Sequence, residues 1–263
     1  MPLYDSIGKS YNRTRSADNR ILNKIISQLN CPAGSIIADI GAGTGNYSYE
    51  LSKLGYFVHA LEPSETMIEQ GKKHDNLKWF KGFAEDIPFE DNYFDGVICT
   101  LSTHHFKSLN KSFTEIHRIL KPNGNLVIFT FDARKTQNND WLKEYFNPFY
   151  KIAVKTAQKR EFVVRMLEKI FKTKVNITNF QLPSDLADHF FYAGWKHPEK
   201  YLDEDFRKGI SVFSMLSQKK TAKIINRLEI DLQTGVWNSN YNYVKKLDKY
   251  EGGYYFMAIK KAE

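Results

Sequence analysis

Apolar residues follow two patterns along the first half of the chain: the spacing of an amphipathic helix, and short continuous runs typical of buried strands. Residues 18–29 carry apolar side chains at the spacing of an amphipathic helix, and this pattern stops before Pro32. A short apolar run at 35–40 then meets a glycine-rich turn, and helical character returns over 47–55. The pattern therefore predicts a helix, a buried strand, a tight turn and a second helix.

The same succession of strand and helix continues to about residue 131. Further strands are predicted at 57–61, 77–81, 94–100 and 125–131, and further helices at 64–73, where Ser64 is the N-cap, and 110–120. Strands that alternate with helices in this way are typical of a largely parallel sheet.

The alternation ends near residue 133. Between 133 and 251, helical stretches rich in Phe, Tyr and Trp surround one β-like segment at 175–182, and an apolar run at 253–259 predicts a last strand that returns to the sheet edge. We therefore expect an α/β fold, a Rossmann-like doubly wound, mostly parallel seven-stranded sheet with a helical cap inserted after the fifth strand. Residues 1–132 and 252–263 form the sheet domain in this prediction, and residues 133–251 form a mainly helical cap or substrate region with one sheet strand near 175–182.

Composition narrows the class of protein. A chain of 263 residues with 42% hydrophobic content can close one sizeable core. No apolar run approaches the roughly 20 residues that span a bilayer, and Met1 to Arg20 is polar, so we expect a cytoplasmic protein. Cys31 and Cys99 have no His or Cys at ligand spacing, which argues against a zinc site or a disulfide framework.

The net charge of +8 is concentrated in one segment. Residues 134–174 hold eleven Lys or Arg against four Asp or Glu, and Lys151, Lys155 and Lys159 recur every four residues, which predicts one basic stripe on a helix. The stripe is either a solvated helix face or a patch for an anionic substrate, a nucleic acid or a membrane surface.

The strongest chemical signal is the run from Ala38 to Asn46. Gly41, Gly43 and Gly45 follow a buried strand and open a helix, so the backbone can turn sharply and a ligand can approach main-chain N–H groups. The dinucleotide fingerprint spaces its glycines G-x-G-x-x-G, and this different spacing disfavours NAD. Glu62 stands 23 residues after Asp39, at the end of the second strand, where a carboxylate can accept hydrogen bonds from both hydroxyls of a ribose.

These residues resemble the class I S-adenosylmethionine-dependent methyltransferases, and within them the UbiE/BioC-like, methyltransferase 11 type of small-molecule enzyme. The resemblance covers 35–131 and includes Glu62-Pro63-Ser64, Ala84-Glu85-Asp86, Tyr93-Phe94-Asp95 and the run from His117 to Gly124. It implies that the glycine loop contacts the methionine part of S-adenosylmethionine, that Glu62 holds the ribose, and that the Ala84-Glu85 turn lies beside the adenine.

One departure from the family pattern is Phe83, which stands where many members have an Asp; its ring packs either on the adenine or in the core. Tyr11 and Arg15 either fold over the cofactor, with Arg15 paired to the methionine carboxylate, or belong to an arm that carries ordinary surface charges. No metal ligand is expected. The expected cofactor-binding residues are Tyr11, Arg15, Asp39, Gly41, Ala42, Gly43, Gly45, Glu62, Pro63, Met67, Phe83, Ala84, Glu85 and Thr100.

Methyl transfer needs alignment and, for a protonated acceptor, a base. His104 and His105 follow the fourth strand, at the sheet edge where such folds bind ligands, and act either as a base or in packing and substrate shape. The cap aromatics either line an acceptor pocket or form the cap core; they include Trp141, Tyr145, Phe146, Phe149, Trp195 and Trp237.

The resemblance implies a methyltransferase with a small-molecule acceptor that the sequence does not identify. Three alternatives remain at this stage: a methyltransferase for RNA or another polyanion, motivated by the basic segment; a protein that binds the cofactor without catalysis; and a nicotinamide-dependent oxidoreductase, which the glycine spacing disfavours.

Overall fold

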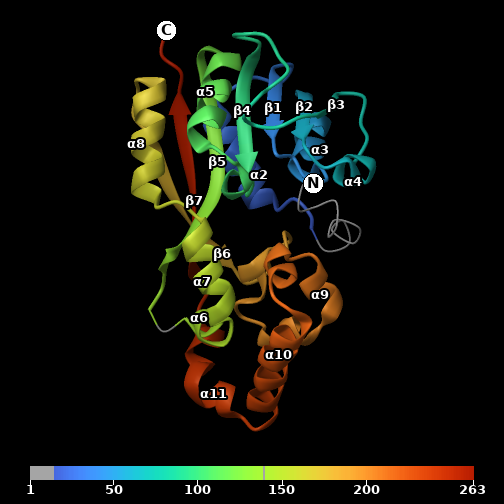
Figure 1. Cartoon of the computed structure of the whole chain (residues 1–263), viewed down its shortest axis with the longest axis vertical. Helices are drawn as coiled ribbons and strands as arrows, with labels where there is room; N and C mark the ends of the chain where they lie inside the picture. The colour runs from blue at the N-terminus through green and yellow to red at the C-terminus, as the bar shows by residue number, and fades with distance from the viewer. Residues whose placement is uncertain (1–14, 139) are drawn as a thin grey trace.

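A computed structural model describes residues 15–138 and 140–263. Within them, a seven-stranded sheet has the strand order β3-β2-β1-β4-β5-β7-β6 (Figure 1). The first five strands are parallel to one another, and β7 is antiparallel to both β5 and β6. The strands are β1 (Ile36–Ile40), β2 (Phe57–Glu62), β3 (Leu77–Lys81), β4 (Phe94–Thr100), β5 (Leu120–Thr136), β6 (Asn176–Pro183) and β7 (Lys249–Lys260). The predicted Rossmann-like, mostly parallel seven-stranded sheet is confirmed.

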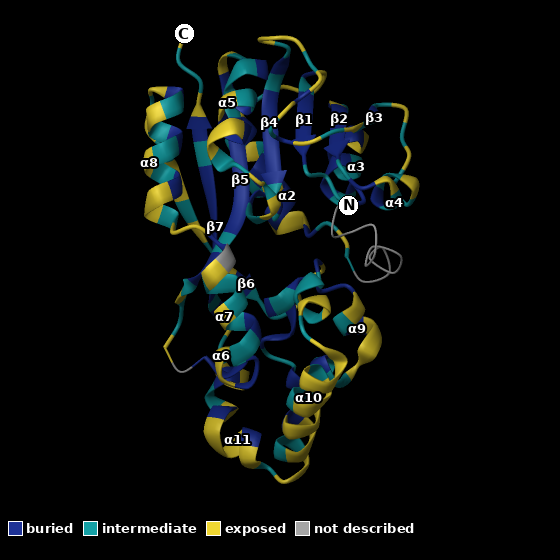
Figure 2. Cartoon of the chain, viewed as in Figure 1, coloured by how far each residue is buried: buried dark blue, intermediate teal, exposed yellow. Residues whose placement is uncertain are grey.

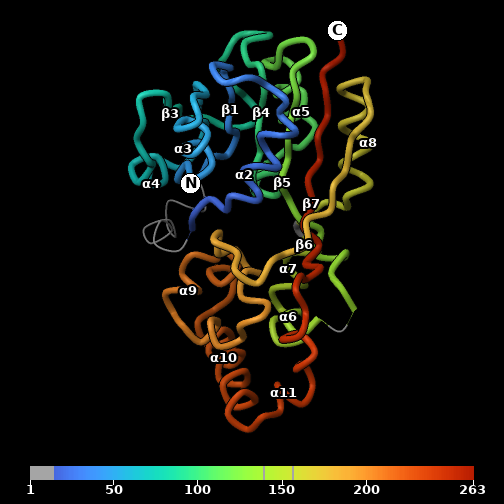
Figure 3. Tube along the Cα trace, turned by 180° about the vertical axis from the view of Figure 1, so that it is seen from behind, coloured from blue at the N-terminus to red at the C-terminus, as the bar shows by residue number. Residues whose placement is uncertain are grey.

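Helices cover both faces of this sheet (Figure 1, Figure 3). Ile37 and Val58 face α2 (Asn19–Leu29) and α3 (Asn46–Lys53), whereas Ala38 and Ile40 belong to the core shared with α5 (Leu109–Ile119) and α8 (Arg160–Phe171). Successive residues of a strand point to opposite faces, so both faces of β1 are buried. This double burial explains the continuous apolar run at 35–40.

Local signals place the ends of these helices. The Asp18 side chain accepts a hydrogen bond from the Arg20 N–H at the start of α2, and Asn30 ends that helix with a φ of 51°. Ser64 and Ser108 cap α4 (Glu65–Glu69) and α5 in the same way. The helix predicted over 64–73 is shorter, since α4 ends at Glu69. Two residues later the Trp79 ring packs against Gly71 so closely that a Cβ on Gly71 would lie 2.4 Å from it.

The remaining helices lie mostly below the sheet in Figure 1 and form a lower body. Its aromatic core joins the sheet core through Phe129, Phe190, Tyr254 and Phe256, and in Figure 2 the outer faces of α10 and α11 are largely exposed. The α-helices are α6 (Trp141–Tyr145), α7 (Asn147–Thr156), α9 (Glu204–Lys208), α10 (Gln218–Gln233) and α11 (Val236–Tyr241). The short 3₁₀ helices of the described residues are η2 (Thr103–His105), η3 (Phe191–Gly194), η4 (Pro198–Leu202), η5 (Ser211–Met215) and η6 (Asn242–Lys246).

Two expectations about the second half are wrong. The last strand, β7, does not form the sheet edge, since it lies between β5 and β6. The single basic stripe is broken, because α7 ends at Thr156 and Lys159 is the N-cap of α8, so Lys159 does not share a helix with Lys151 and Lys155.

Residues 133–251 form the lower body, and they also contribute the strand β6 to the sheet and the helix α8 to the core on one of its faces. The division of the chain at residues 133 and 251 stays a prediction. In the described part of the chain, no helix combines the length and the apolar character needed to cross a membrane.

Candidate cofactor and acceptor site

The glycine turn connects β1 to α3. Gly41 and Gly43 have φ values of 74° and 59°, in the left-handed region that favours glycine. A Cβ on Gly41 would lie 2.6 Å from the Cβ of Ser102, so this position has no room for a side chain. At Gly43 no heavy atom lies within 4 Å of such a Cβ, so its backbone borders open space. The turn thus leaves main-chain groups accessible at the carboxyl end of β1.

The Glu62 carboxylate fixes this turn from the end of β2. Its Oε2 accepts a hydrogen bond from the Gly43 N–H at 2.9 Å, and its Oε1 accepts one from the Ser64 N–H at 3.0 Å. Glu62 is buried, and each carboxylate oxygen can accept two hydrogen bonds. The side chain therefore orders the glycine turn and retains the chemical capacity to accept hydroxyl donors.

Two buried polar atoms near the turn have no hydrogen-bond partner in the structure. Asp39 accepts a hydrogen bond from the Ser48 hydroxyl at 2.6 Å through Oδ2, but its Oδ1 is buried and unpartnered, as is Oγ1 of Thr100. Burial raises the pKa of Asp39 to about 7, and the nearby Glu62 charge adds to this rise. Because buried polar atoms in proteins are nearly always satisfied, these two fit donors on a bound molecule.

A cavity of about 280 Å³ lies over this edge of the sheet. Twelve of the predicted cofactor-binding residues line it: Arg15, Asp39, Gly41, Ala42, Gly43, Glu62, Pro63, Met67, Phe83, Ala84, Glu85 and Thr100. Gly45 is not among the lining residues; it begins α3 with its Cα against the Trp79 ring. Tyr11 lies outside the described residues.

The end of this cavity at Phe83 has an aromatic face. Phe83 is 44% exposed, so it is not a core residue, and the Lys107 Nζ lies 4.6 Å from its ring centroid. The Glu85 carboxylate accepts hydrogen bonds from the Ser108 N–H at 3.0 Å and the Ser112 hydroxyl at 3.2 Å. The side chain of Glu85 is thus held against the N-terminus of α5.

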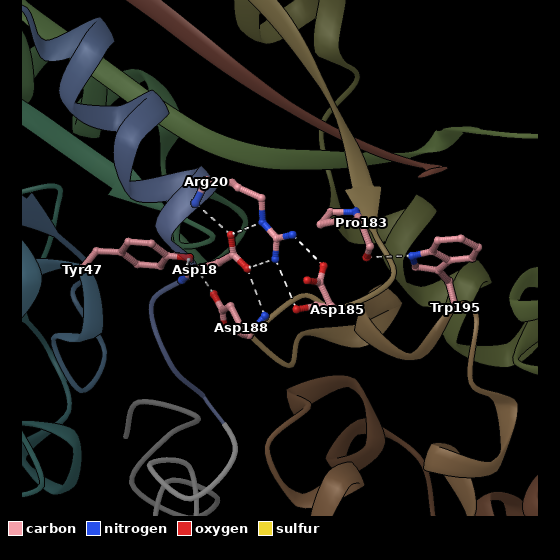
Figure 4. A network of polar contacts seen from close by, with 8 residues as sticks. Asp18, Arg20, Tyr47, Pro183, Asp185, Asp188 and Trp195 are labelled. Atoms are coloured by element: carbon pink, nitrogen blue, oxygen red, sulfur yellow. Dashed lines mark hydrogen bonds and ion pairs between the residues drawn. The ribbon is translucent and has the colours of Figure 1, made fainter. Parts of the chain in front are cut away.

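A polar network joins the cavity to the segment that leads from β6 into the lower body (Figure 4). The Arg15 guanidinium pairs with Asp188, and the Tyr47 hydroxyl donates to Asp188 at 3.1 Å. Beside it, Arg20 pairs with Asp18 and Asp185, each at 2.6 Å. Arg15, Tyr47 and Asp188 all line the cavity, although Asp188 is 173 positions from Arg15.

A second cavity of about 110 Å³ adjoins the first, and Arg15 and Leu101 line both. His105 lines the first cavity and His104 the second, with ring centroids 3.9 Å apart. Desolvation by the surrounding protein lowers the pKa of His104 well below the usual imidazole range, with His105 and Arg15 contributing, and desolvation also lowers the pKa of His105. Both rings are therefore neutral near pH 7.

Most of the cap aromatics named from the sequence lie elsewhere. Trp141, Trp195 and Trp237 are fully buried in the core of the lower body, and only Phe149 of the six lines a described cavity. The described side chains of His, Cys, Asp and Glu form no group of three or more that could hold a metal ion.

Comparisons with known proteins agree with this geometry. A family model described as a methyltransferase domain, of the methyltransferase 11 type, matches residues 38–128. A putative methyltransferase from an antibiotic biosynthesis pathway of Anabaena variabilis has a solved structure with a TM-score of 0.91 and 41% identity, covering 94% of this chain and 98% of that one. Demethylmenaquinone methyltransferase of Clavibacter sepedonicus is 30% identical over 140 residues, which are 50% of this chain and 57% of that protein.

A more distant structure shares the fold alone. Phosphoethanolamine N-methyltransferase 2 of Haemonchus contortus, in complex with S-adenosyl-L-methionine, has a TM-score of 0.63 and 18% identity, covering 99% of this chain and 56% of that one. The chain spans about half the length of the curated relatives it matches.

A Rossmann-like sheet with a glycine turn and a buried carboxylate at its carboxyl edge is an architecture typical of nucleotide-binding α/β proteins. The chain belongs to the class I S-adenosylmethionine-dependent methyltransferases, in the methyltransferase 11 branch that includes UbiE-like enzymes. Its cofactor is S-adenosylmethionine, the methyl donor of this family.

Proposed function

We propose that this protein transfers a methyl group from S-adenosylmethionine to a small-molecule acceptor. The observation that carries the proposal is the pair of adjoining cavities: one is lined by the glycine turn, Glu62 and the unpartnered Asp39 Oδ1, and the other meets it at Arg15 and Leu101. When bound, the cofactor supplies a sulfonium methyl group, which a nucleophile takes as the carbon–sulfur bond breaks and its electron pair stays on sulfur.

The first cavity holds the cofactor in this proposal. Glu62 accepts hydrogen bonds from the ribose hydroxyls, while Asp39 and the backbone at Gly43 face the amino-acid part. Phe83 packs on the adenine ring, and the main chain at Ala84 and Glu85 meets its edge.

The chain contributes positioning and a proton acceptor. Arg15 and Leu101 line both cavities, so an acceptor in the second cavity lies beside a methyl group presented from the first. His104 lines the second cavity as a neutral imidazole, and it takes the proton that a hydroxyl acceptor loses. His105, on the cofactor side, shapes the wall between them.

The test is calorimetric titration of the full chain with S-adenosylhomocysteine, with NAD as the control ligand, followed by a methyl-transfer assay over small-molecule acceptors. We expect micromolar binding of S-adenosylhomocysteine and none of NAD. No binding of S-adenosylhomocysteine would overturn the proposal, and binding without transfer to any acceptor would favour a non-catalytic binding protein. Transfer to RNA alone, with an affinity for RNA that falls steeply as the salt concentration rises, would favour the alternative hypothesis of a polyanion acceptor. The cytoplasmic location stays a prediction.

A further inference from the structure

The second cavity is built from segments far apart in the sequence. Phe131 and Ala133 come from the end of β5, Phe149 and Ile152 from α7, and Tyr254 from β7, with η3 and η5 completing the wall. These walls are fixed by their own packing: the Tyr254 ring stacks on Phe190 with centroids 4.4 Å apart. The cavity is therefore a formed aromatic and aliphatic site rather than a gap between mobile surfaces.

The charged side chains that line this cavity have one sign. Its described lining residues include the cations Arg15 and Lys143 and no Asp or Glu. Arg15 pairs with Asp188, the Lys143 Nζ lies 4.6 Å from the Tyr150 ring centroid, and His104 is neutral. An ammonium group that entered this cavity would lose its hydration without gaining a carboxylate, which is costly. The lining disfavours cationic acceptors.

The size of the cavity limits the acceptor further. Its volume of about 110 Å³ is of the same order as the roughly 150 Å³ apolar cavity that holds a benzene molecule in an engineered protein. A single ring fits, and the aromatic walls offer stacked and edge contacts to it. The polar lining at His104 offers a hydrogen bond to a hydroxyl group on that ring.

We propose that the second cavity is the acceptor site, and that it takes an uncharged, ring-sized apolar molecule with a hydroxyl group toward His104, and not an ammonium compound. This inference rests on the proposed function, since the cavity receives a methyl group only if the first cavity holds the cofactor.

The experiment uses the full chain saturated with S-adenosylhomocysteine and two matched probes, 4-methylphenol and the cation 4-methylbenzylamine, followed at pH 7 by saturation-transfer NMR. Ala153→Trp places a large ring in the second cavity, and Ala222→Trp, on the groove beside α10, is the matched control. We expect 4-methylphenol to bind the parent protein and the control variant, and to lose at least about tenfold in affinity in Ala153→Trp, because the added ring fills its place. The cation should show no measurable binding.

Binding of S-adenosylhomocysteine, measured in parallel, separates the two proposals. If it is unchanged while 4-methylphenol binds Ala153→Trp as well as the parent, or if 4-methylbenzylamine binds as tightly as the phenol, the acceptor-site inference is wrong and the proposed function stands. If S-adenosylhomocysteine does not bind the parent protein, the proposed function itself is wrong. Should Ala153→Trp fail to fold by circular dichroism, Val212→Phe fills the same cavity from η5.

Discussion

Replacement of Glu62 by Ala tests the part of the site with the best-defined geometry. The carboxylate accepts the Gly43 N–H at 2.9 Å and the Ser64 N–H at 3.0 Å, so it holds the glycine turn to the end of β2. In the proposed complex it also accepts the two ribose hydroxyls. The variant should therefore lose cofactor affinity, both directly and through the turn.

The expected loss follows from the charged acceptor. Hydrogen bonds to a charged group contribute about 1.5 to 3 kcal/mol each, and two that share one carboxylate are less than additive, so we expect a loss of about 2 to 4 kcal/mol. At 1.4 kcal/mol per factor of ten, the dissociation constant rises by about 30-fold to about 700-fold.

The assay is calorimetry with S-adenosylhomocysteine and with its 2′,3′-dideoxy analogue. The analogue lacks both hydroxyls, so Glu62→Ala should weaken its binding far less, and the difference between the two losses is the coupling of Glu62 to the ribose. Glu65→Ala is the control, because Glu65 is exposed and pairs with Lys81 at the surface. An unchanged dissociation constant in Glu62→Ala, or an equal loss for both ligands, would refute the assigned role.

Three further variants test other parts of the structure. His104→Gln should lower the transfer rate by about 10²-fold without changing S-adenosylhomocysteine affinity. Because the lowered pKa keeps His104 neutral through the ordinary imidazole range, the parent rate should not halve near pH 6.5, and a rate that does so argues against this role. Burial raises the pKa of Asp39 from 3.8 to about 7, so between pH 3.8 and pH 7 the folded state binds a proton that the unfolded state has lost. The free energy of unfolding therefore falls as the pH rises through this range. Asp39→Asn should remove this pH dependence, which urea titrations at pH 5 and pH 8 measure. Asp140→Ala leaves the Tyr192 and Tyr250 hydroxyls without their acceptor inside the lower body. The free energy of unfolding should fall by about 3 kcal/mol, which calorimetry would detect as a drop of about 6 to 12 °C in Tm. An unchanged Tm would contradict this.

Local sequence patterns predict several elements of the fold and part of the cofactor site. The strands β1 and β4 and the start of α2 could be placed because burial period and capping residues act over a few positions. The glycine turn and Glu62 could be found for the same reason, since both lie at the ends of adjacent parallel strands, and Glu62 follows Asp39 within one strand-helix-strand unit.

The contacts between distant segments that complete the site cannot be predicted from local patterns, because they form only when the chain folds. Asp188 contacts both Arg15 and Tyr47. Local spacing cannot predict the pair of Arg15 with Asp188, because the two residues are 173 positions apart. β7 lies inside the sheet because β6 pairs with the side of β7 that faces away from β5. This pairing is a contact between two strands, and the sequence of neither strand alone predicts it. The second cavity, likewise, is lined by segments that are far apart in the sequence, and its apolar lining residues are of the same types as those that fill the core. Packing alone decides which of them face a ligand, because burial and binding require the same kinds of side chain.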